Sequence, residues 1–486
     1  MISNYKHKFT FLALFAFAMI VSCSDPWDDH AKAGDSNLNE NLSARIKNMP
    51  QTSDFGDLLT ETGYDSILSS SKTYTVWVPT NDAMAQVDAS VLTNMEDKRL
   101  FVLNHIALTS YSSVSDQDTV SVAMLSDKFL EFKNGNMIAE SNIIEADQYA
   151  ENGLYHVIDE ALTPRLNIWE YLQEEAPSND MSQFMMSLDD FDIYPSDSLA
   201  KATAENSEEI IFADSLTNSY LLNVYNLNNE RNKYTFFLIE DDAYQDEVET
   251  LEPYLIKGTV DSTNTYASYF TVRDMAFHKS YSRENLPDTL TSKFGVKVPI
   301  NPNMILEEVK LSNGVLFRMS AVDVPLEKRL LTTIIQGENP SGFSQGDKRN
   351  NTFYRDKASP SGEPFSDIMV QNHEVPLFGI YYNANNLYST TYRVYWRAVN
   401  DIQENTFQQS LRIGGEFQED GTVANPIASL PYTNVPPDDY SEIFIGEFTL
   451  EEAGRLDLIT LLAANTAVNG QNTLTLDYLK FVPVIK

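Results

Sequence analysis

The sequence predicts an α+β fold over roughly the first two thirds of the chain, followed by an all-β C-terminal third. Up to Leu331, apolar residues at helical spacing interleave with short alternating strands. Beyond Leu331, only short alternating segments separated by turn residues remain. The length of 486 residues suggests about three domains of ~150 residues each. A hydrophobic content of 42% is enough to build buried cores in all of them.

The N-terminus has the build of a secretory signal peptide, which we place at residues 1–22. Lys6 and Lys8 precede the apolar run Phe9–Ile20, which is shorter than the roughly 20 residues of a membrane span. Ile20-Val-Ser-Cys23 resembles the lipobox of bacterial lipoproteins, and this resemblance implies a lipid anchor on Cys23, the single cysteine of the chain. The alternative is an ordinary signal peptide followed by a free cysteine.

Residues 23–41 combine the lipidated cysteine with an acidic tether. Ser24–Asp29 resembles the surface-export signal of Bacteroidota-type lipoproteins, which implies an outer-membrane protein that faces the cell exterior. The alternative is a solvated acidic linker with no address function.

The charge balance excludes several partners. The chain has 34 Lys and Arg against 70 Asp and Glu, a formal charge of −36. Such a field repels nucleic acid, and it leaves membrane attachment to the acyl chain alone. If Cys23 carries lipid, no thiol remains for a disulfide, a cysteine nucleophile or a cysteine-ligated zinc.

The first module, residues 42–164, begins with helices and continues with strands. Leu42, Ile46 and Met49 lie on one helical face, and Tyr74–Val78 alternates as a strand. Thr80-Asn-Asp-Ala-Met84 supplies capping side chains ahead of the next helix. Tight turns are predicted at Asn134-Gly135 and Asn152-Gly153.

Three segments of this module carry a family resemblance. Tyr74-Thr-Val-Trp-Val-Pro-Thr-Asn-Asp-Ala83 and Asn152-Gly-Leu-Tyr-His-Val-Ile-Asp159 resemble the two signatures of fasciclin domains. Asn104-His105 lies where the family has a Tyr-His motif, with asparagine in place of tyrosine. The resemblance implies a β-sandwich wrapped by helices.

The same order recurs in residues 165–334, which we interpret as a second, degenerate fasciclin module. After the helix Ile168–Leu172, Tyr234–Tyr244 aligns with the first signature and Asn313–Met319 with the second. Pro253–Ile256 is aligned with the Tyr-His region, which puts Leu255 at the histidine position.

Residues 335–486 are predicted to form a β-sandwich entered by a long loop, Gln336–Pro364. Tyr392–Ala398, Ile445–Ile459 and Leu474–Pro483 resemble strands of jelly-roll carbohydrate-binding modules of the galactose-binding-like class. Some such sandwiches hold a structural calcium near the position of Asp477, although no other residue pattern supports a metal here.

Candidate ligand-binding residues follow from the alternation of Tyr392–Ala398. Period two places Tyr392, Val394 and Trp396 in the core and turns the other three side chains outward. Aromatic faces stack on sugar rings while polar groups hold the hydroxyls. The predicted binding residues are Arg393, Tyr395 and Arg397, joined by the loop aromatics Tyr388 and Tyr432.

No catalytic or metal constellation is predicted. Gly342-Phe-Ser-Gln-Gly346 matches the nucleophile-elbow pattern, but Pro340 interrupts the strand that this chemistry needs, and no apolar helix follows. The six histidines show no metal-ligand spacing, and His105 and His156 read as hydrogen-bonded core residues.

We therefore expect a non-catalytic cell-surface lipoprotein, without a cofactor, that binds a polysaccharide or oligosaccharide. The expected setting is an outer-membrane nutrient uptake system of the SusC/SusD-like kind, with the transporter and its lipoproteins as partners. The alternative is a fasciclin-type adhesin that binds matrix proteins or other cells, and an unrecognised enzyme is a third possibility.

Overall fold

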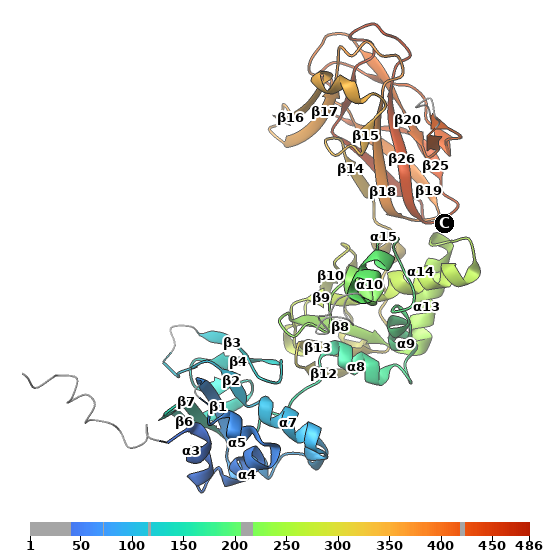
Figure 1. Cartoon of the computed structure of the whole chain (residues 1–486). Coiled ribbons are helices and arrows are strands. Elements are labelled where there is room, and N and C mark those ends of the chain that lie inside the picture. Colours follow the sequence, from blue (N-terminus) through green and yellow to red (C-terminus); the bar gives the residue numbers. More distant parts are fainter. Residues whose placement is uncertain (1–39, 71, 115–117, 206–216, 418–422) are drawn as a thin grey trace, which may run out of the picture. The chain divides into compact units, whose positions relative to one another are not determined.

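The computed structural model describes residues 40–70, 72–114, 118–205, 217–417 and 423–486 (Figure 1). The predicted signal peptide, Cys23 and nearly all of the acidic tether lie outside these residues. The chain divides into two compact units, Met1–Leu166 and Asn167–Lys486. In the described part of the chain, no helix combines the length and apolar character of a membrane span.

The first unit is α+β, with its helices mostly ahead of its strands. Its helices are α3 (Leu42–Asn48), α4 (Ser53–Thr62), α5 (Tyr64–Ile67), α6 (Asn81–Met84), η2 (Ala89–Leu92) and α7 (Met95–Leu103). Its strands are β1 (Tyr74–Pro79), β2 (Ile106–Leu108), β3 (Thr119–Ala123), β4 (Phe129–Lys133), β5 (Met137–Ile138), β6 (Ser141–Ala150) and β7 (Gly153–Ile158). They are ordered β2-β1-β7-β6-β5-β4-β3, and β1 runs parallel to β7.

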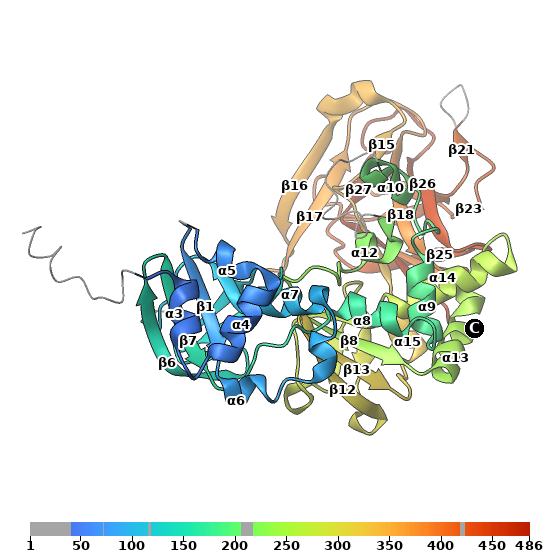
Figure 2. The ribbon, with the colours of Figure 1, turned by 60° about the horizontal axis from the view of Figure 1, so that its bottom comes forward.

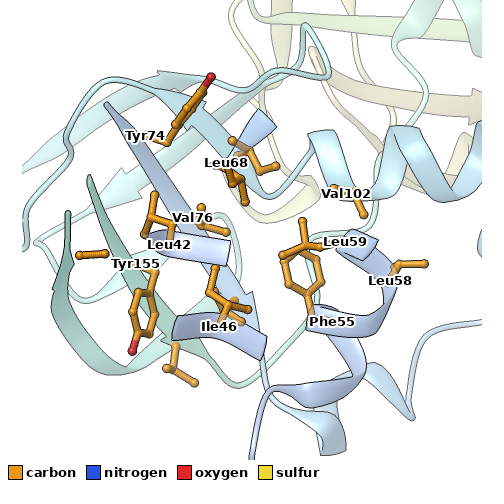
Figure 3. Packing of buried hydrophobic residues seen from close by; sticks show 14 of the residues in the cluster. Leu42, Ile46, Phe55, Leu58, Leu59, Leu68, Tyr74, Val76, Val102 and Tyr155 are labelled. Carbon is orange, nitrogen blue, oxygen red and sulfur yellow. The ribbon is translucent and has the colours of Figure 1, made fainter. Parts of the chain in front are cut away.

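The core of the first unit lies between α3, α4 and the sheet. Leu42 and Ile46 of α3 and Phe55 of α4 are fully buried against Val76 of β1 and Tyr155 of β7, as the labelled side chains show (Figure 3). The helical spacing and the strand predicted from sequence are both confirmed. Thr80 caps α6 as predicted, because its side chain accepts the Ala83 N–H at 3.1 Å.

The second unit opens with a helical and mixed part. Its helices are α8 (Ile168–Glu175), α9 (Asp180–Ser187), α10 (Asp197–Glu205), α12 (Ser219–Asn223), α13 (Asp241–Leu251), η4 (Glu252–Tyr254), α14 (Val260–Val272), η5 (Arg283–Asn285), η6 (Pro302–Met304) and α15 (Leu326–Arg329). Its strands are β8 (Tyr234–Ile239), β9 (Ala276–His278), β10 (Thr289–Thr291), β11 (Lys297–Pro299), β12 (Ile305–Leu311) and β13 (Gly314–Met319). Helices α9, α13 and α14 lie side by side (Figure 2).

This part of the second unit repeats the central strand order of the first. The order β9-β8-β13-β12 corresponds to β2-β1-β7-β6, and β8 pairs parallel with β13 as β1 does with β7. The side chain of Asn152 accepts the Leu42 N–H and donates to the Leu68 and Ser70 carbonyls. Asn313 does the same with the Ile168 N–H and the Leu227 and Asn229 carbonyls. Two asparagines 161 positions apart therefore make the same pattern of contacts, one in each unit.

The structure corrects one step of the predicted alignment between the two segments. In the first unit, the Trp77 N–H bonds to the carbonyl of His105, directly before β2. In the second, the Phe237 N–H bonds to the carbonyl of Met275, directly before β9. By strand position Met275, and not Leu255, therefore corresponds to His105, so the predicted alignment of Leu255 was wrong. The sequence misled because α14, the helix before β9, is longer than α7, the helix before β2.

The C-terminal part is built mainly of β-strands. They are β14 (Thr333–Gln336), β15 (Gly342–Phe343), β16 (Thr352–Ala358), β17 (Pro364–Val370), β18 (Gly379–Leu387), β19 (Thr391–Arg397), β20 (Phe407–Ile413), β21 (Glu416–Phe417), β22 (Val423–Ala424), β23 (Ala428–Ser429), β24 (Thr433–Val435), β25 (Glu442–Thr449), β26 (Gly454–Ala463), β27 (Leu474–Leu476) and β28 (Tyr478–Pro483). One sheet has the order β14-β28-β19-β25, and a second has β15-β18-β26-β20-β23. The Tyr382 hydroxyl of β18 donates to the Gly337 carbonyl, beyond β14, at 2.9 Å.

The predicted loop Gln336–Pro364 is only partly a loop. It contains β15, the 3-10 helix η7 (Gly346–Asn351) and the whole of β16, which pairs with β17 as a hairpin (Figure 2). The segment Thr352–Ala358 carries Arg355, Asp356 and Lys357, so its alternation is of charged and polar rather than apolar residues. This segment is a strand because it pairs with β17, although its sequence lacks the apolar alternation that would have predicted one.

Within the second unit, the C-terminal β-rich part is joined to the preceding part through buried and partly buried contacts. The Tyr388 side chain is buried, and its hydroxyl donates to the Arg329 carbonyl at 2.9 Å. The Lys486 N–H donates to the Tyr254 hydroxyl at 2.9 Å, and the Tyr194 hydroxyl donates to Asn386 Oδ1 at 3.0 Å. These contacts explain why residues 167–486 cluster as one compact unit.

Candidate binding face on the C-terminal sheet

Strand β19 separates its side chains as the sequence predicts. Tyr392, Val394 and Trp396 are fully buried, which confirms the predicted core face. Arg393 and Tyr395 lie on the other side of the strand, with Arg393 exposed and Tyr395 half-buried.

The neighbouring strands extend this outer side into a surface that we call the β19 face. It comprises one cross-strand row and its charged flanks: Ile334, Arg393, Tyr395, Glu442, Phe444, Glu447, Tyr478 and Lys480. In the row, Ile334 pairs with Lys480, Lys480 with Tyr395, and Tyr395 with Phe444. Phe444 is 51% exposed and Ile334 is 46% exposed. The row therefore spans four strands and offers apolar surface to solvent at its two ends, Ile334 on β14 and Phe444 on β25.

The two aromatic rings in the row contact each other. The ring centroids of Tyr395 and Phe444 are 5.4 Å apart at an interplanar angle of 60°. The Lys480 ammonium lies 5.5 Å from the Tyr395 ring centroid, within cation–π range. Packing between strands thus holds the Tyr395 ring in place while one side of the pair remains open.

Charged and polar groups flank the row. Glu442 accepts hydrogen bonds from Lys480 Nζ at 2.9 Å and from the Tyr478 hydroxyl at 2.9 Å. Partial burial, followed by the contact with Glu442, raises the pKa of Tyr478 to about 12, so its hydroxyl remains a donor at neutral pH. Arg393 pairs with Glu447 at 3.3 Å. The face therefore holds fixed donors and acceptors beside apolar rings, as a polyhydroxylated ligand requires.

Arg397 belongs to the same strand but does not lie open. Its side chain is only 17% exposed, and Nη1 lies 3.0 Å from Asp477 Oδ2. Nε donates to the Tyr440 carbonyl at 3.0 Å, and the guanidinium lies 4.9 Å from the Phe365 ring centroid. The expected open Arg-Tyr-Arg stripe therefore holds for Arg393 and Tyr395, whereas the head of Arg397 turns into the protein.

The two predicted loop aromatics lie away from this face. Tyr388 is only 4% exposed because it packs at the junction inside the second unit. Tyr432 is 41% exposed, but it precedes β24, which pairs with β20 of the other sheet, and its hydroxyl donates to the Ala463 carbonyl at 3.0 Å. The structure brings together Arg393 and Tyr395, but neither Tyr388 nor Tyr432 joins them. The predicted lipid anchor, Cys23, lies outside the described residues.

The pattern Gly342–Gly346 does not form a nucleophile elbow. Ser344 follows the short strand β15, and its hydroxyl accepts the Gly379 N–H at 2.9 Å. A 3-10 helix follows in place of an α-helix. The elbow needs a strand leading through a sharp turn into a helix, so Ser344 has an edge-strand role here.

The two histidines of the first unit are core residues, as predicted. His105 is fully buried, with Nδ1 donating to the Phe101 carbonyl at 2.8 Å and Nε2 accepting the Leu162 N–H at 2.9 Å. His156 is also buried, and Nε2 donates to the Tyr111 carbonyl at 2.8 Å. Because carbonyls only accept, these contacts assign a neutral tautomer to each ring.

The possible structural calcium near Asp477 finds no cage in the described residues. No group of three or more His, Cys, Asp or Glu side chains there is arranged to hold a metal ion. Asp477 faces the guanidinium of Arg397 instead. The residues present do not fit a calcium ion.

Sequence reasoning missed Phe444, Tyr478 and Lys480. Alternation along Tyr478–Pro483 predicts that Tyr478 and Lys480 point outward. The sequence does not show that their strand pairs with β19. For β25, a register shift between Val394 and Tyr395 of the partner strand breaks the alternation. Phe444 therefore faces outward while Phe448 is buried.

Comparison with known proteins identifies one domain. The family model for the Fasciclin domain matches residues 50–164. "Protein sll1483" of Synechocystis sp. (strain ATCC 27184 / PCC 6803 / Kazusa) is 30% identical over 105 residues, which is 20% of this chain. The matched stretch spans 58% of that relative.

Solved structures are similar to both the N-terminal and the C-terminal regions, at low scores. A FAS1 domain pair from the insect cell adhesion molecule Fasciclin I has 17% identity and a TM-score of 0.23, covering 58% of this chain and 99% of that one. The CBM36-1 domain of a multidomain xylanase from the hindgut metagenome of Trinervitermes trinervoides has 19% identity and a TM-score of 0.21, covering 32% of this chain and 100% of that one. Likeness at this level assigns no ligand to this chain. The family match identifies part of the molecule: the chain contains a fasciclin domain at residues 50–164.

Proposed function

We propose that this chain is a non-catalytic, lipid-anchored protein of the outer cell surface that captures glycan on its β19 face. In this proposal the captured polysaccharide or oligosaccharide passes to a SusC/SusD-like outer-membrane transporter, with which the chain associates. The lipobox-like Ile20–Cys23 and the acidic Ser24–Asp29 support the location.

The observation that carries the proposal is the contact between half-buried Tyr395 and exposed Phe444 on the outer side of the sheet. An aromatic face exposed to solvent beside fixed hydrogen-bonding groups matches the chemistry of a sugar, which has one apolar side and a rim of hydroxyls. Glu442 and Lys480 supply an acceptor and a donor next to the rings. Their mutual contact and the packing of Tyr395 against Phe444 reduce the side-chain freedom that binding would otherwise remove.

The rest of the chain supports this role as scaffold. We propose that residues 165–334 are a second, degenerate fasciclin module and that residues 335–486 are a jelly-roll module of the carbohydrate-binding type. The repeated strand order and the matching roles of Asn152 and Asn313 favour a duplicated module. The pair would hold the β19 face away from the membrane or dock on transporter partners.

The adhesin alternative finds less support in the fasciclin domain. Asn104 and His105, at the Tyr-His motif, are 1% and 0% exposed. Asn104 donates to the Leu162 carbonyl at 2.8 Å and accepts the Ser126 hydroxyl at 2.7 Å. Side chains committed to the domain's own interior offer an adhesion partner no contact at this motif.

The test is a glycan-array screen of residues 24–486 with two single variants, Tyr395→Ala and Phe444→Ala. Each should weaken binding of a retained glycan about 10-fold or more, since losing a central aromatic contact costs at least ~1.4 kcal/mol. Tyr432→Ala is the matched control, because it removes an exposed tyrosine from the other sheet. If Tyr432→Ala weakens binding and the two β19-face variants do not, the site is wrong. No retained glycan on the array would overturn glycan capture itself.

A further inference from the structure

A buried cluster of charged side chains lies near the C-terminal end of β19. Asp477 follows β27, Asp367 lies on β17, and Asp401 follows β19; their side chains are 6%, 0% and 9% exposed. Arg355 of β16 donates to Asp367 Oδ1 at 2.7 Å and to Asp401 Oδ1 at 2.8 Å. Lys357 of the same strand also pairs with Asp401, so two cations from the β16–β17 hairpin neutralise the carboxylates of Asp367 and Asp401.

Asp477 is served by a different cation, Arg397. Asp477 Oδ2 lies 3.0 Å from Arg397 Nη1 in ion-pair contact, although this approach lacks hydrogen-bond geometry. The Asp477 N–H bonds to the Arg397 carbonyl at 2.8 Å, so backbone and side chain of the two residues face each other. Glu338 Oε2 is also buried without a hydrogen bond from the described residues. Burial, opposed by Arg397 and reinforced by Asp367 and Glu338, raises the pKa of Asp477 to about 6.

The guanidinium of Arg397 is held on three sides. Asp477 lies at one side, the Tyr440 carbonyl accepts from Nε at 3.0 Å, and the Phe365 ring lies 4.9 Å from the guanidinium carbon. A calcium ion would need six to eight oxygen ligands at about 2.3–2.6 Å. The planar guanidinium of Arg397 supplies positive charge beside the Asp477 carboxylate without needing such a set of ligands.

We propose that the guanidinium of Arg397 takes the place of a structural calcium ion beside Asp477, so that the C-terminal sandwich folds without a divalent cation. Removing this one charge leaves the buried carboxylate of Asp477 without its cation. Because the neighbouring side chains that the structure describes do not form a calcium cage, calcium should not replace the lost guanidinium.

The experiment compares thermal unfolding of residues 24–486 and its Arg397→Met variant, each in EDTA and in millimolar CaCl₂. Methionine keeps an apolar side chain against Phe365 while the charge is lost. The transition of the second unit in the parent protein should occur at the same temperature in both buffers. Arg397→Met should lower it by on the order of 5 °C in EDTA and in CaCl₂ alike. Arg455→Met is the matched control, because Arg455 is 57% exposed and pairs only with exposed Asp457.

A second variant keeps the test decisive if Arg397→Met folds poorly. In Arg397→Met/Asp477→Asn, neither member of the pair is charged, so stability should partly return in both buffers. Stabilisation of the parent protein or of Arg397→Met by calcium would overturn the proposal, since a cation site would then exist beside Asp477. No recovery of stability in the double variant would also overturn it, because Arg397 would then act through packing alone. Glycan binding is not a readout here, so failure of the proposed function leaves this result unaffected.

Discussion

His105 and His156 of the fasciclin domain use both ring nitrogens inside the fold. Each ring donates to one backbone carbonyl and accepts one backbone N–H. Burial lowers the pKa of both, and that of His105 falls to about 4. A protonated ring would lose its acceptor and leave a backbone N–H unpaired, so the folded state favours the neutral form.

Because the fold requires neutral histidines, the fasciclin domain should lose stability in acid. The folded pKa of His105 lies below the unfolded value of about 6.5, so its contribution to the free energy of unfolding is complete above pH 6.5. It is lost as pH falls toward 4, by an amount on the order of 3 kcal/mol. Hydrogen exchange of β1 peptides in the full chain should therefore speed up between pH 6.5 and 4, after correction for intrinsic exchange rates.

The His105→Gln variant should weaken this dependence of exchange on pH. His278→Gln is the control, because His278 is exposed at the end of β9. An unchanged pH dependence in His105→Gln would show that other groups govern the acid response.

At the scale of the element, a glycine at the start of β7 and of β13 lets each strand lie close to its parallel partner, β1 or β8. A Cβ on Gly153 would lie 2.0 Å from the Tyr74 carbonyl oxygen, and one on Gly314 would lie 2.0 Å from the Tyr234 carbonyl oxygen. Both glycines also have φ near +150°, which side-chain-bearing residues rarely adopt. The backbone approach at the start of each parallel strand pair therefore requires glycine.

Gly314→Ala is expected to reduce the free energy of unfolding of the second unit by at least ~2 kcal/mol, since either β8 or β13 must shift. This loss is measured by chemical denaturation of the full chain, with hydrogen exchange of peptides from β8 as the readout. Gly346→Ala is the control, because a Cβ there meets no atom within 4 Å. Equal stability of the two variants would contradict the close approach of β8 and β13.

At the scale of the whole molecule, the second unit joins two parts that the sequence presents as separate domains. Tyr388 of the sandwich lies among groups of the preceding part: its hydroxyl bonds to Arg329 and its ring packs edge-on against Phe270 at 6.2 Å. Buried Asp274 lies there too, accepting the Ser292 hydroxyl at 2.6 Å. Breaking this junction would expose buried charge and apolar surface together.

Calorimetry of the full chain should therefore show two unfolding transitions, one for each compact unit, rather than three. Tyr388→Ala should lower only the transition of the second unit, because removing a buried aromatic side chain costs about 3–5 kcal/mol. Tyr432→Ala, which truncates an exposed tyrosine of the same sandwich, should leave it nearly unchanged. Three transitions in the parent protein would contradict a jointly folding second unit.

Local patterns in the sequence predicted much of this protein. The helix at Leu42, the strands at Tyr74 and Tyr234, and the two Asn-Gly turns before β5 and β7 are all present, because hydrophobic period and turn chemistry act within a few residues. The inward and outward faces of β19 follow for the same reason. The Fasciclin match bears out the resemblance of the first module.

Tertiary structure decided what those patterns could not. Whether Tyr388 is exposed depends on a partner 59 positions earlier, and the direction of the Arg397 head depends on Asp477, 80 positions later. Phe444 faces outward only because a register shift interrupts its strand pair. Alternation assigns a side chain to one face of a strand, but which strands lie beside it, and what covers that face, is set by long-range packing.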